Sequence, residues 1–161
     1  MTPASPSTAL PDVLAIAARH AKEPGGLMPA LHAVQNACGY IPKESVTGIA
    51  EIFNLSRAEV HGVITYYHHF RSEPAGRCVV QVCRAESCQS MGAEALWAHA
   101  QLKLGCSGDH GSSADGVYTL EPVYCLGLCA QSPAMVVGSE VHARITPAKF
   151  DRIVAEAGAA V

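Results

Sequence analysis

Apolar residues in the first half of the chain recur at helical spacing. They predict four short helices, over about residues 12–23, 29–37, 42–53 and 56–67. Gly39 follows the second of these, and glycine is the residue that most easily ends a helix in the left-handed conformation. Ser56 and Glu59 match the capping box, in which each side chain satisfies a backbone amide at the start of a helix. The first half is therefore expected to be a small helical bundle.

After residue 76 the spacing changes to that of an α/β unit. Short β-branched runs predict strands at 78–83, 117–124, 134–137 and 141–144, with helices over about 91–104 and 147–157. The segment Gly105–Gly116 is rich in glycine, serine and aspartate and is expected to be a surface loop. Composition changes near Pro74, which predicts two domains, residues 1–75 and 76–161, with residues 1–10 mobile.

Composition restricts the classes of protein to which the chain can belong. Of its 161 residues, 49% are hydrophobic and 16% are charged, so a real core is expected rather than disorder. The formal charge of -3 and the lack of a basic run argue against a nucleic-acid partner. The longest aliphatic run, Val13 to Ala18, is too short to span a membrane, and the start of the chain lacks the pattern of a secretory signal. A cytoplasmic protein is expected.

Cysteine is the residue that points to chemistry. The chain has seven, an odd and high number that in a reducing compartment indicates metal ligands or redox thiols rather than disulfides. Two pairs directly follow predicted strands and are expected to meet at one edge of the sheet. These are Cys83 and Cys88 in a C-x4-C motif and Cys125 and Cys129 in a C-x3-C motif.

Four thiolates suit either one tetrahedral zinc ion or a 2Fe-2S cluster with two ligands on each iron. The wide spacing of both pairs favours the cluster, because inorganic sulfides also need nearby hydrogen-bond donors. Gly92, Gly127 and Ser87 would let backbone or hydroxyl groups approach. A zinc site and a pair of redox-active disulfides remain alternatives, although neither pair has the C-x-x-C spacing of dithiol enzymes.

The other candidate residues have simpler interpretations. Cys38 and Cys78 are expected to be small buried hydrophobic residues, and Cys106, in the predicted loop, is expected to be exposed. The neighbouring His68 and His69 are expected to have a structural or interface role at a helix end rather than to bind metal. Arg84 adjoins the first cysteine, where it would raise the reduction potential of a cluster or else point to solvent.

Two segments carry a resemblance to a known family. The segments VCRAESCQSMGAEAL and VYCLGLCAQSPAMVVG resemble the thioredoxin-like 2Fe-2S ferredoxins, including the small subunit that accompanies the flavin subunit in complex I and soluble NAD-linked dehydrogenases. The resemblance implies a thioredoxin-like domain behind a helical bundle, with Cys83, Cys88, Cys125 and Cys129 as cluster ligands. After Cys88 the sequence departs from many complex I subunits, which continue with a hydrophobic residue and then Arg-Gly, whereas here Gln89, Ser90, Met91 and Gly92 follow.

Within the family, the SCQSMG form and the compact length most resemble the gamma subunit of soluble, molybdenum-containing, NAD-dependent formate dehydrogenase. This resemblance implies an electron-transfer subunit in a complex that converts formate and NAD+ to CO2 and NADH. Equivalent subunits of complex I or of an NAD-reducing hydrogenase are the alternatives. A flavin/NADH-binding subunit and a molybdenum-containing subunit would be partners holding FMN, NAD, the molybdenum cofactor and further Fe-S clusters, and the isolated chain would catalyse nothing.

The helical bundle contains no member of the two cysteine pairs, so it needs another role. We expect it to dock onto the flavin subunit, and the aromatic run Tyr66 to Phe70 is the candidate surface.

Overall fold

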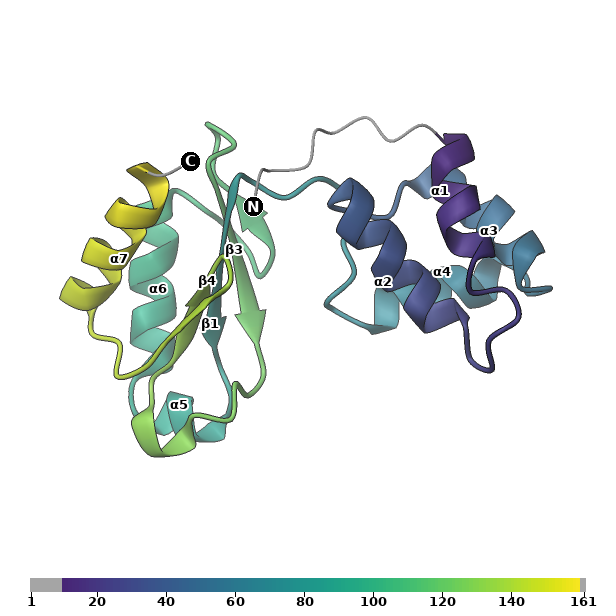
Figure 1. Ribbon diagram of the computed structural model, residues 1–161. Coiled ribbons are helices and arrows are strands. Elements are labelled where there is room, and N and C mark those ends of the chain that lie inside the picture. Colours follow the sequence, from purple (N-terminus) through teal and green to yellow (C-terminus); the bar gives the residue numbers. More distant parts are fainter. Residues whose placement is uncertain (1–9, 160–161) are drawn as a thin grey trace. The chain divides into compact units, whose positions relative to one another are not determined.

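In the computed structural model of the protein, residues 10–159 are described. The chain divides into two compact units, one ending at Pro74 and the other beginning at Ala75 (Figure 1). The stretch before residue 10, which was expected to be mobile, lies outside the described residues. None of the helices in residues 10–159 has the length and apolar character that crossing a bilayer requires.

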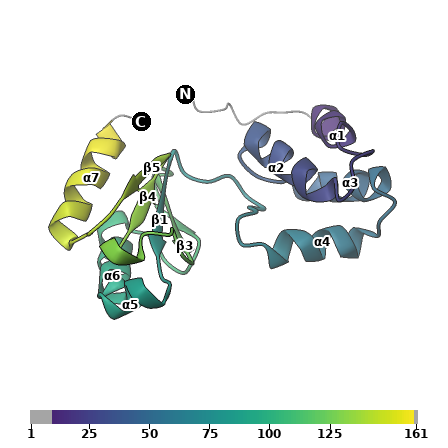
Figure 2. The same ribbon diagram turned by 60° about the horizontal axis from the view of Figure 1, so that its bottom comes forward.

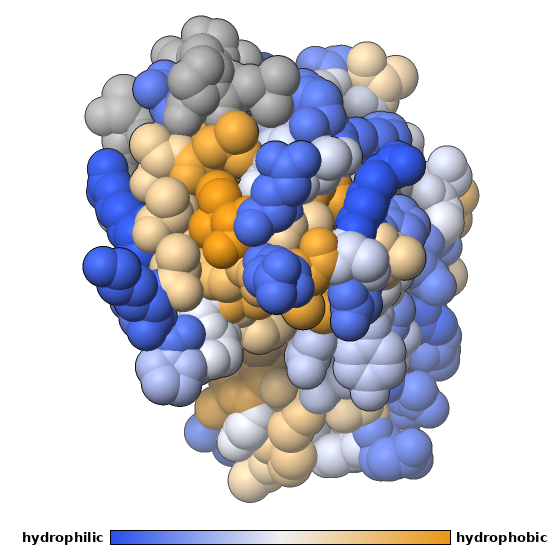
Figure 3. Space-filling view, turned by 90° about the vertical axis from the view of Figure 1, so that its right-hand side faces the viewer, coloured by the Kyte–Doolittle hydropathy of each residue, from blue (hydrophilic) through white to orange (hydrophobic). Residues whose placement is uncertain are grey.

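The first unit, called the helical unit below, consists of helices packed around one apolar core (Figure 2). Its fully buried side chains include Leu31, Val34, Ile49 and Val60, and burying each of these stabilises the fold by about 1.5–3 kcal/mol. Other apolar side chains are only partly buried, and Figure 3 shows hydrophobic side chains among hydrophilic ones on one face. The elements are α1 (Leu10–Ala18), α2 (Leu27–Cys38), the 3-10 helix η1 (Lys43–Ser45), α3 (Val46–Ile52) and α4 (Arg57–Tyr66).

Both predicted helix-end signals are confirmed. Gly39 follows α2 with a φ of 84°, and its N–H donates to the carbonyl of Gln35. At the start of α4, the Glu59 N–H donates to the Ser56 hydroxyl and the Ser56 N–H donates to the Glu59 carboxylate. These hydrogen bonds satisfy backbone groups that the helices themselves leave without partners.

A buried glutamine ties the end of this unit back to α2. The Gln35 side chain is 4% exposed, its Nε2 donates to the carbonyl of His69 at 2.8 Å, and its Oε1 accepts from the N–H of Arg71 at 2.7 Å. Because α4 ends at Tyr66, His68 and His69 lie in the turn beyond it rather than within a helix. The His69 ring lies 5.1 Å from that of His32, so it is part of a local ring cluster.

The second unit, called the sheet unit below, has the mixed α/β architecture that the sequence predicts. Its sheet has the strand order β2-β3-β1-β4-β5, in which β1 and β3 run parallel and the other neighbours run antiparallel. The elements are β1 (Cys78–Cys83), α5 (Glu86–Ser90), α6 (Ala93–Leu104), β2 (Gly111–Ser112), β3 (Tyr118–Val123), the 3-10 helix η2 (Cys129–Gln131), β4 (Met135–Val137), β5 (Glu140–His142) and α7 (Pro147–Ala159).

Helices α6 and α7 cover one side of this sheet (Figures 1 and 2). Cys78, Val80 and Val82 alternate along β1 as buried residues, and they belong to the same core as Trp97 of α6 and Phe150 of α7. The alternation is that of a strand with one face against helices. The predicted role of Cys78 as a small buried residue is confirmed.

Three elements differ from the sequence-based expectation. Helix α1 ends at Ala18 rather than near residue 23, and the N–H groups of the next three residues donate to carbonyls three residues back, as in turns. Residues 86–90 form the short helix α5, so Cys88 lies in a helix and not in a loop. Within the expected loop, Gly111 and Ser112 form β2, which pairs with Leu120 and Thr119 of β3. Helix α5 and strand β2 are both too short to show a hydrophobic period. Strand β2 exists only because β3 offers an edge for pairing.

Candidate metal centre

The parallel pairing of β1 and β3 brings both cysteine pairs to one edge of the sheet. Cys83 is the last residue of β1 and lies opposite Val123, the last residue of β3, two positions before Cys125. The N–H of Arg84 donates to the carbonyl of Val123 at 2.8 Å, which continues the pairing one residue past β1. The expectation that two strand ends deliver the cysteines to one edge is therefore confirmed.

The first pair is buried. Cys83 and Cys88 are only 2% and 4% exposed. The turn of helix in α5 folds Cys88 back toward the strand end, and the Gln89 side chain holds that turn by donating to the carbonyl of Arg84 at 2.7 Å. A C-x4-C segment would otherwise lead away from the sheet, so α5 is what keeps the two thiols together.

The second pair is exposed and lies on an unusual backbone. Cys125 has a φ of 92°, a region that costs a residue with a side chain about 1–3 kcal/mol and is most often found at functional sites. Gly127 has a φ of 75°, and its N–H donates to the Cys125 Sγ at 3.4 Å. Cys129 begins η2. The turn thus points an amide at a cysteine sulfur, as the glycine in this motif predicted.

Hydrogen bonds make the Cys83 sulfur a favourable place for negative charge. Burial disfavours ionisation of this thiol, but donors outweigh it and lower its pKa below the ordinary value. The donors are the backbone N–H of Ala85, the side chain of Cys88 and the backbone N–H groups of Cys125 and Leu126. The second loop thus supplies amides to a sulfur of the first, which is the donor arrangement that a thiolate bound to a metal needs.

The second pair shows the opposite effect. The pKa of Cys129 is raised, first because of its hydrogen bond with Cys125, then because of the negative charge of that neighbour and burial, with a further contribution from Cys88. Two thiolates this close repel each other unless a cation lies between them. The side chains of the four cysteines therefore interact most strongly within the pairs, Cys83 with Cys88 and Cys125 with Cys129, and Cys88 also acts on Cys129 across them.

Two serine hydroxyls lie between the cysteine loops. Ser87 Oγ is 2.9 Å from Ser132 Oγ, and both hydroxyls are within hydrogen-bond distance of the Cys129 carbonyl. Ser132 Oγ is also 3.5 Å from the Cys88 Sγ. The sequence indicated Ser87 as a nearby hydroxyl but gave no sign of Ser132, which reaches the site only through the fold.

Arg84 neither points to solvent nor offers a free positive charge to the site. Its guanidinium binds the Glu94 carboxylate through two bonds of 3.0 and 2.9 Å and Asp109 at 3.0 Å. It also lies 4.9 Å from the centre of the Trp97 ring. One cation with two carboxylates has an overall charge of -1, so this group as a whole brings no positive charge toward the cysteines. The arrangement therefore gives no reason to expect that Arg84 by itself raises the reduction potential of a cluster.

The remaining cysteines lie outside the site. Cys38 and Cys78 are buried as expected, whereas Cys106 is 5% exposed and the expectation of an exposed thiol is wrong. Its side chain faces the core near Leu104 and Tyr118, and burial raises the pKa of both Cys78 and Cys106. A raised pKa keeps these thiols protonated near neutral pH, so they are poor ligands.

The donor set fits a two-iron cluster. A cluster of two irons takes two thiolates on each iron and accepts hydrogen bonds at sulfur, and the site offers two thiol pairs with amide donors around them. The site therefore matches the predicted cofactor in the chemistry of its donors.

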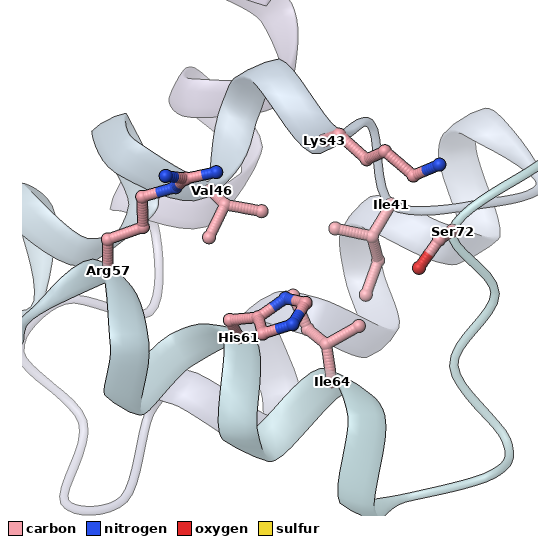
Figure 4. Close-up of a pocket in the computed structure, with 7 residues that line it drawn as sticks. All are labelled: Ile41, Lys43, Val46, Arg57, His61, Ile64 and Ser72. Atoms are coloured by element: carbon pink, nitrogen blue, oxygen red, sulfur yellow. The ribbon is translucent and has the colours of Figure 1, made fainter.

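A separate hollow of about 130 Å³ lies in the helical unit (Figure 4). Its apolar wall comes from Ile41, Val46 and Ile64, Arg57 and His61 point toward it, and Lys43 also lines it. Lys43 pairs with Glu73 at 3.1 Å. The hollow lies beside α4, and no cysteine is among the residues that line it.

Comparison with known proteins shows which family has this arrangement. Residues 13–158 match the sequence model of the thioredoxin-like 2Fe-2S ferredoxins, a range that includes both units. The chain is 34% identical over 142 residues to an NADH-quinone oxidoreductase subunit of Rhizobium meliloti, covering 88% of this chain and 84% of that one. It is 33% identical over 136 residues to the HndA subunit of the NADP-reducing hydrogenase of Solidesulfovibrio fructosivorans, covering 82% and 77%.

A solved structure shares the fold. An NAD+-reducing NiFe-hydrogenase in the air-oxidized state matches 84% of this chain with a TM-score of 0.68 at 21% identity. The match covers 23% of the hydrogenase chain, so this chain corresponds to about a quarter of that one.

Proposed function

The chain belongs to the thioredoxin-like 2Fe-2S ferredoxin family, and we propose from this premise that it is the electron-transfer subunit of an NAD-linked oxidoreductase complex. As a member of this family it holds a 2Fe-2S cluster. When bound, that cluster takes up and releases one electron at a time.

The observation that supports this function best is the meeting of the two cysteine pairs at the ends of β1 and β3. We assign Cys83, Cys88, Cys125 and Cys129 as the four ligands. The amides that lower the pKa of Cys83 would stabilise its thiolate in the same way when it binds iron. Cys83 and Cys88 are buried and keep water from one side of the site, while Cys125 and Cys129 are exposed.

The exposed pair indicates where a redox partner binds. Electrons pass between proteins over short distances, so a partner must approach the side on which the ligands reach the surface. Tyr124, directly before Cys125, is 60% exposed, and Met91, shortly after Cys88, is 61% exposed. Exposed aromatic and methionine side chains are typical of interface cores. We propose that the flavin/NADH-binding subunit contacts this side.

The complex we propose is a soluble, molybdenum-containing formate dehydrogenase that converts formate and NAD+ to CO2 and NADH. Support comes from the SCQSMG form of the first ligand segment. The relatives named above are a quinone oxidoreductase subunit and a hydrogenase subunit, so both remain the alternatives. Purification of the intact complex from its host separates them: a molybdenum-containing subunit with formate-dependent NAD+ reduction supports the proposal, and a nickel-containing or membrane-bound partner contradicts it.

We further propose that the helical unit docks onto the flavin subunit. Tyr66 and Tyr67 are 75% and 45% exposed at the end of α4, with their rings in edge-to-face contact, whereas Phe70 is buried. A shortened chain that begins at Gly76 should keep the colour of the cluster and lose co-purification with the flavin subunit. Undiminished binding of the shortened chain would rule the docking role out.

The cofactor and its ligands are tested on the isolated chain. Purified protein should be brown and lose its colour with dithionite, and the reduced protein should show an S = 1/2 paramagnetic resonance signal. A zinc protein or a dithiol oxidoreductase would be colourless. The isolated chain should neither oxidise formate nor reduce NAD+, because those reactions need cofactors that we assign to its partners.

A further inference from the structure

Two serine hydroxyls connect the segments that carry the cysteine pairs. Ser132 Oγ lies 3.5 Å from the Cys88 Sγ and 2.9 Å from Ser87 Oγ. Ser132 precedes β4 and Ser87 lies in α5, so the fold brings together residues that are 45 positions apart. Both hydroxyls also reach the carbonyl of Cys129, at 3.1 Å from Ser87 and 2.9 Å from Ser132.

The count of protons decides what this arrangement does when Cys88 binds iron. As a thiol, Cys88 donates its proton to Ser132 Oγ, and both hydroxyl protons are available to the Cys129 carbonyl. As a metal ligand, Cys88 has lost that proton and its sulfur can only accept. One hydroxyl proton must then turn to the sulfur. Ser132 is placed to donate it, and Ser87 remains the donor to the carbonyl.

We propose that Ser132 donates a hydrogen bond to the Cys88 thiolate and thereby raises the reduction potential of the cluster, with Ser87 as the residue that positions Ser132. This inference rests on the proposed function. Reduction adds one electron and moves no proton, so the negative charge on the ligand sulfurs grows and a hydrogen bond to sulfur becomes stronger. Cys88 is 4% exposed, and at such a buried sulfur water cannot replace a lost donor.

Ser87 acts through Ser132. If Ser87 is removed, the Cys129 carbonyl loses one donor and competes with the Cys88 sulfur for the single proton of Ser132. Ser87→Ala should therefore lower the potential in the same direction as Ser132→Ala, but by less. If Ser87 and Ser132 only held the two cysteine-bearing segments together, the reduction potential would not change in these variants. A purely structural role does not depend on which atom receives the hydroxyl proton.

The experiment is a redox titration of the full chain, followed by the paramagnetic resonance signal of the reduced protein. Ser132→Ala should shift the midpoint potential to a more negative value, and Ser132→Thr, which keeps a hydroxyl, should restore it. Ser90→Ala is the matched control, since Ser90 also lies in α5 but its hydroxyl donates to the carbonyl of Ser87 at 2.9 Å. The midpoint potential of Ser90→Ala should equal that of the wild type.

A second measurement covers the case in which Ser132→Ala assembles no cluster. Wild-type protein exchanged into D2O and reduced should show exchangeable deuterons coupled to the electron spin, some of them from the backbone amides at Cys83 and Cys125, and Ser87→Ala should weaken one of these couplings. A Ser132→Ala protein with full iron and sulfide content and an unchanged potential would overturn the inference, as would a Ser87→Ala protein whose deuteron couplings equal those of the wild type. Wild-type protein without the absorption of a 2Fe-2S cluster would instead refute the proposed function.

Discussion

Replacing Arg84 by alanine tests how the segment between Cys83 and Cys88 is held to the rest of the sheet unit. The side chain is 21% exposed and joins the residue after Cys83 to α6 through Glu94 and to the following loop through Asp109. Its guanidinium also lies over Trp97. The alanine variant loses all three contacts, while the hydrogen bond between Gln89 and the backbone carbonyl of Arg84 remains possible.

The expected loss of stability is moderate because the partners are exposed. The side chains of Glu94 and Asp109 are 52% and 64% exposed. Solvent screens such pairs, and each contributes about 0.3–1 kcal/mol. The contact of the guanidinium with the Trp97 ring adds about 0.5–1 kcal/mol. We therefore expect Arg84→Ala to lower the free energy of unfolding by about 1–3 kcal/mol, and Arg84→Lys to lose less because it retains the charge.

Urea unfolding followed by fluorescence measures this loss, because Trp97 is the only tryptophan of the chain and lies in the affected core. With a denaturant dependence of about 2 kcal/mol per M, the midpoint should fall by about 0.5–1.5 M. High salt should reduce the difference, since it screens the two ion pairs. Arg152→Ala, at an exposed position of α7, is the control and should change stability by less than about 0.5 kcal/mol. A midpoint for Arg84→Ala equal to that of the wild type would refute the reasoning.

Three further predictions concern the two units. Gln35→Ala removes both hydrogen bonds that tie the turn after α4 to α2, so the helical unit should lose about 2–3 kcal/mol in unfolding followed by circular dichroism; unchanged stability would contradict this. The hydrogen bond from Arg84 lowers the pKa of Glu94 in the folded protein. The contribution of Glu94 to the free energy of unfolding should therefore be fully present above the pKa of Glu94 in the unfolded chain, and it should be lost as the pH falls through the lower pKa of the folded protein. A Glu94→Gln variant as stable as the wild type at neutral pH would contradict this prediction. Cys125→Ala should lose most of the iron and sulfide while Cys106→Ala retains them, and full content in Cys125→Ala would reject that ligand.

Features determined by neighbours in the sequence could be predicted from it. The left-handed glycine after α2 and the capping box of α4 depend on backbone groups within a few residues, and both are confirmed. The strands that end at or before the two cysteine motifs were predicted as well, because short β-branched runs are a local signal. Parallel pairing of these strands then places the motifs at the same edge of the sheet.

Other features were decided only by the tertiary structure. Cys106 lies in a segment without hydrophobic spacing, yet it is buried because α6 and β3 close over it. The role expected of Arg84 rested on its neighbour Cys83, but the carboxylates that bind its guanidinium are 10 and 25 residues away in the sequence. Ser132 meets Ser87 and Cys88 only after the two loops have come together. A side chain's charge and hydrogen-bonding capacity are properties of the sequence. Its partners are set by which distant segments the sheet brings into contact, and no local sequence pattern encodes which segments those are.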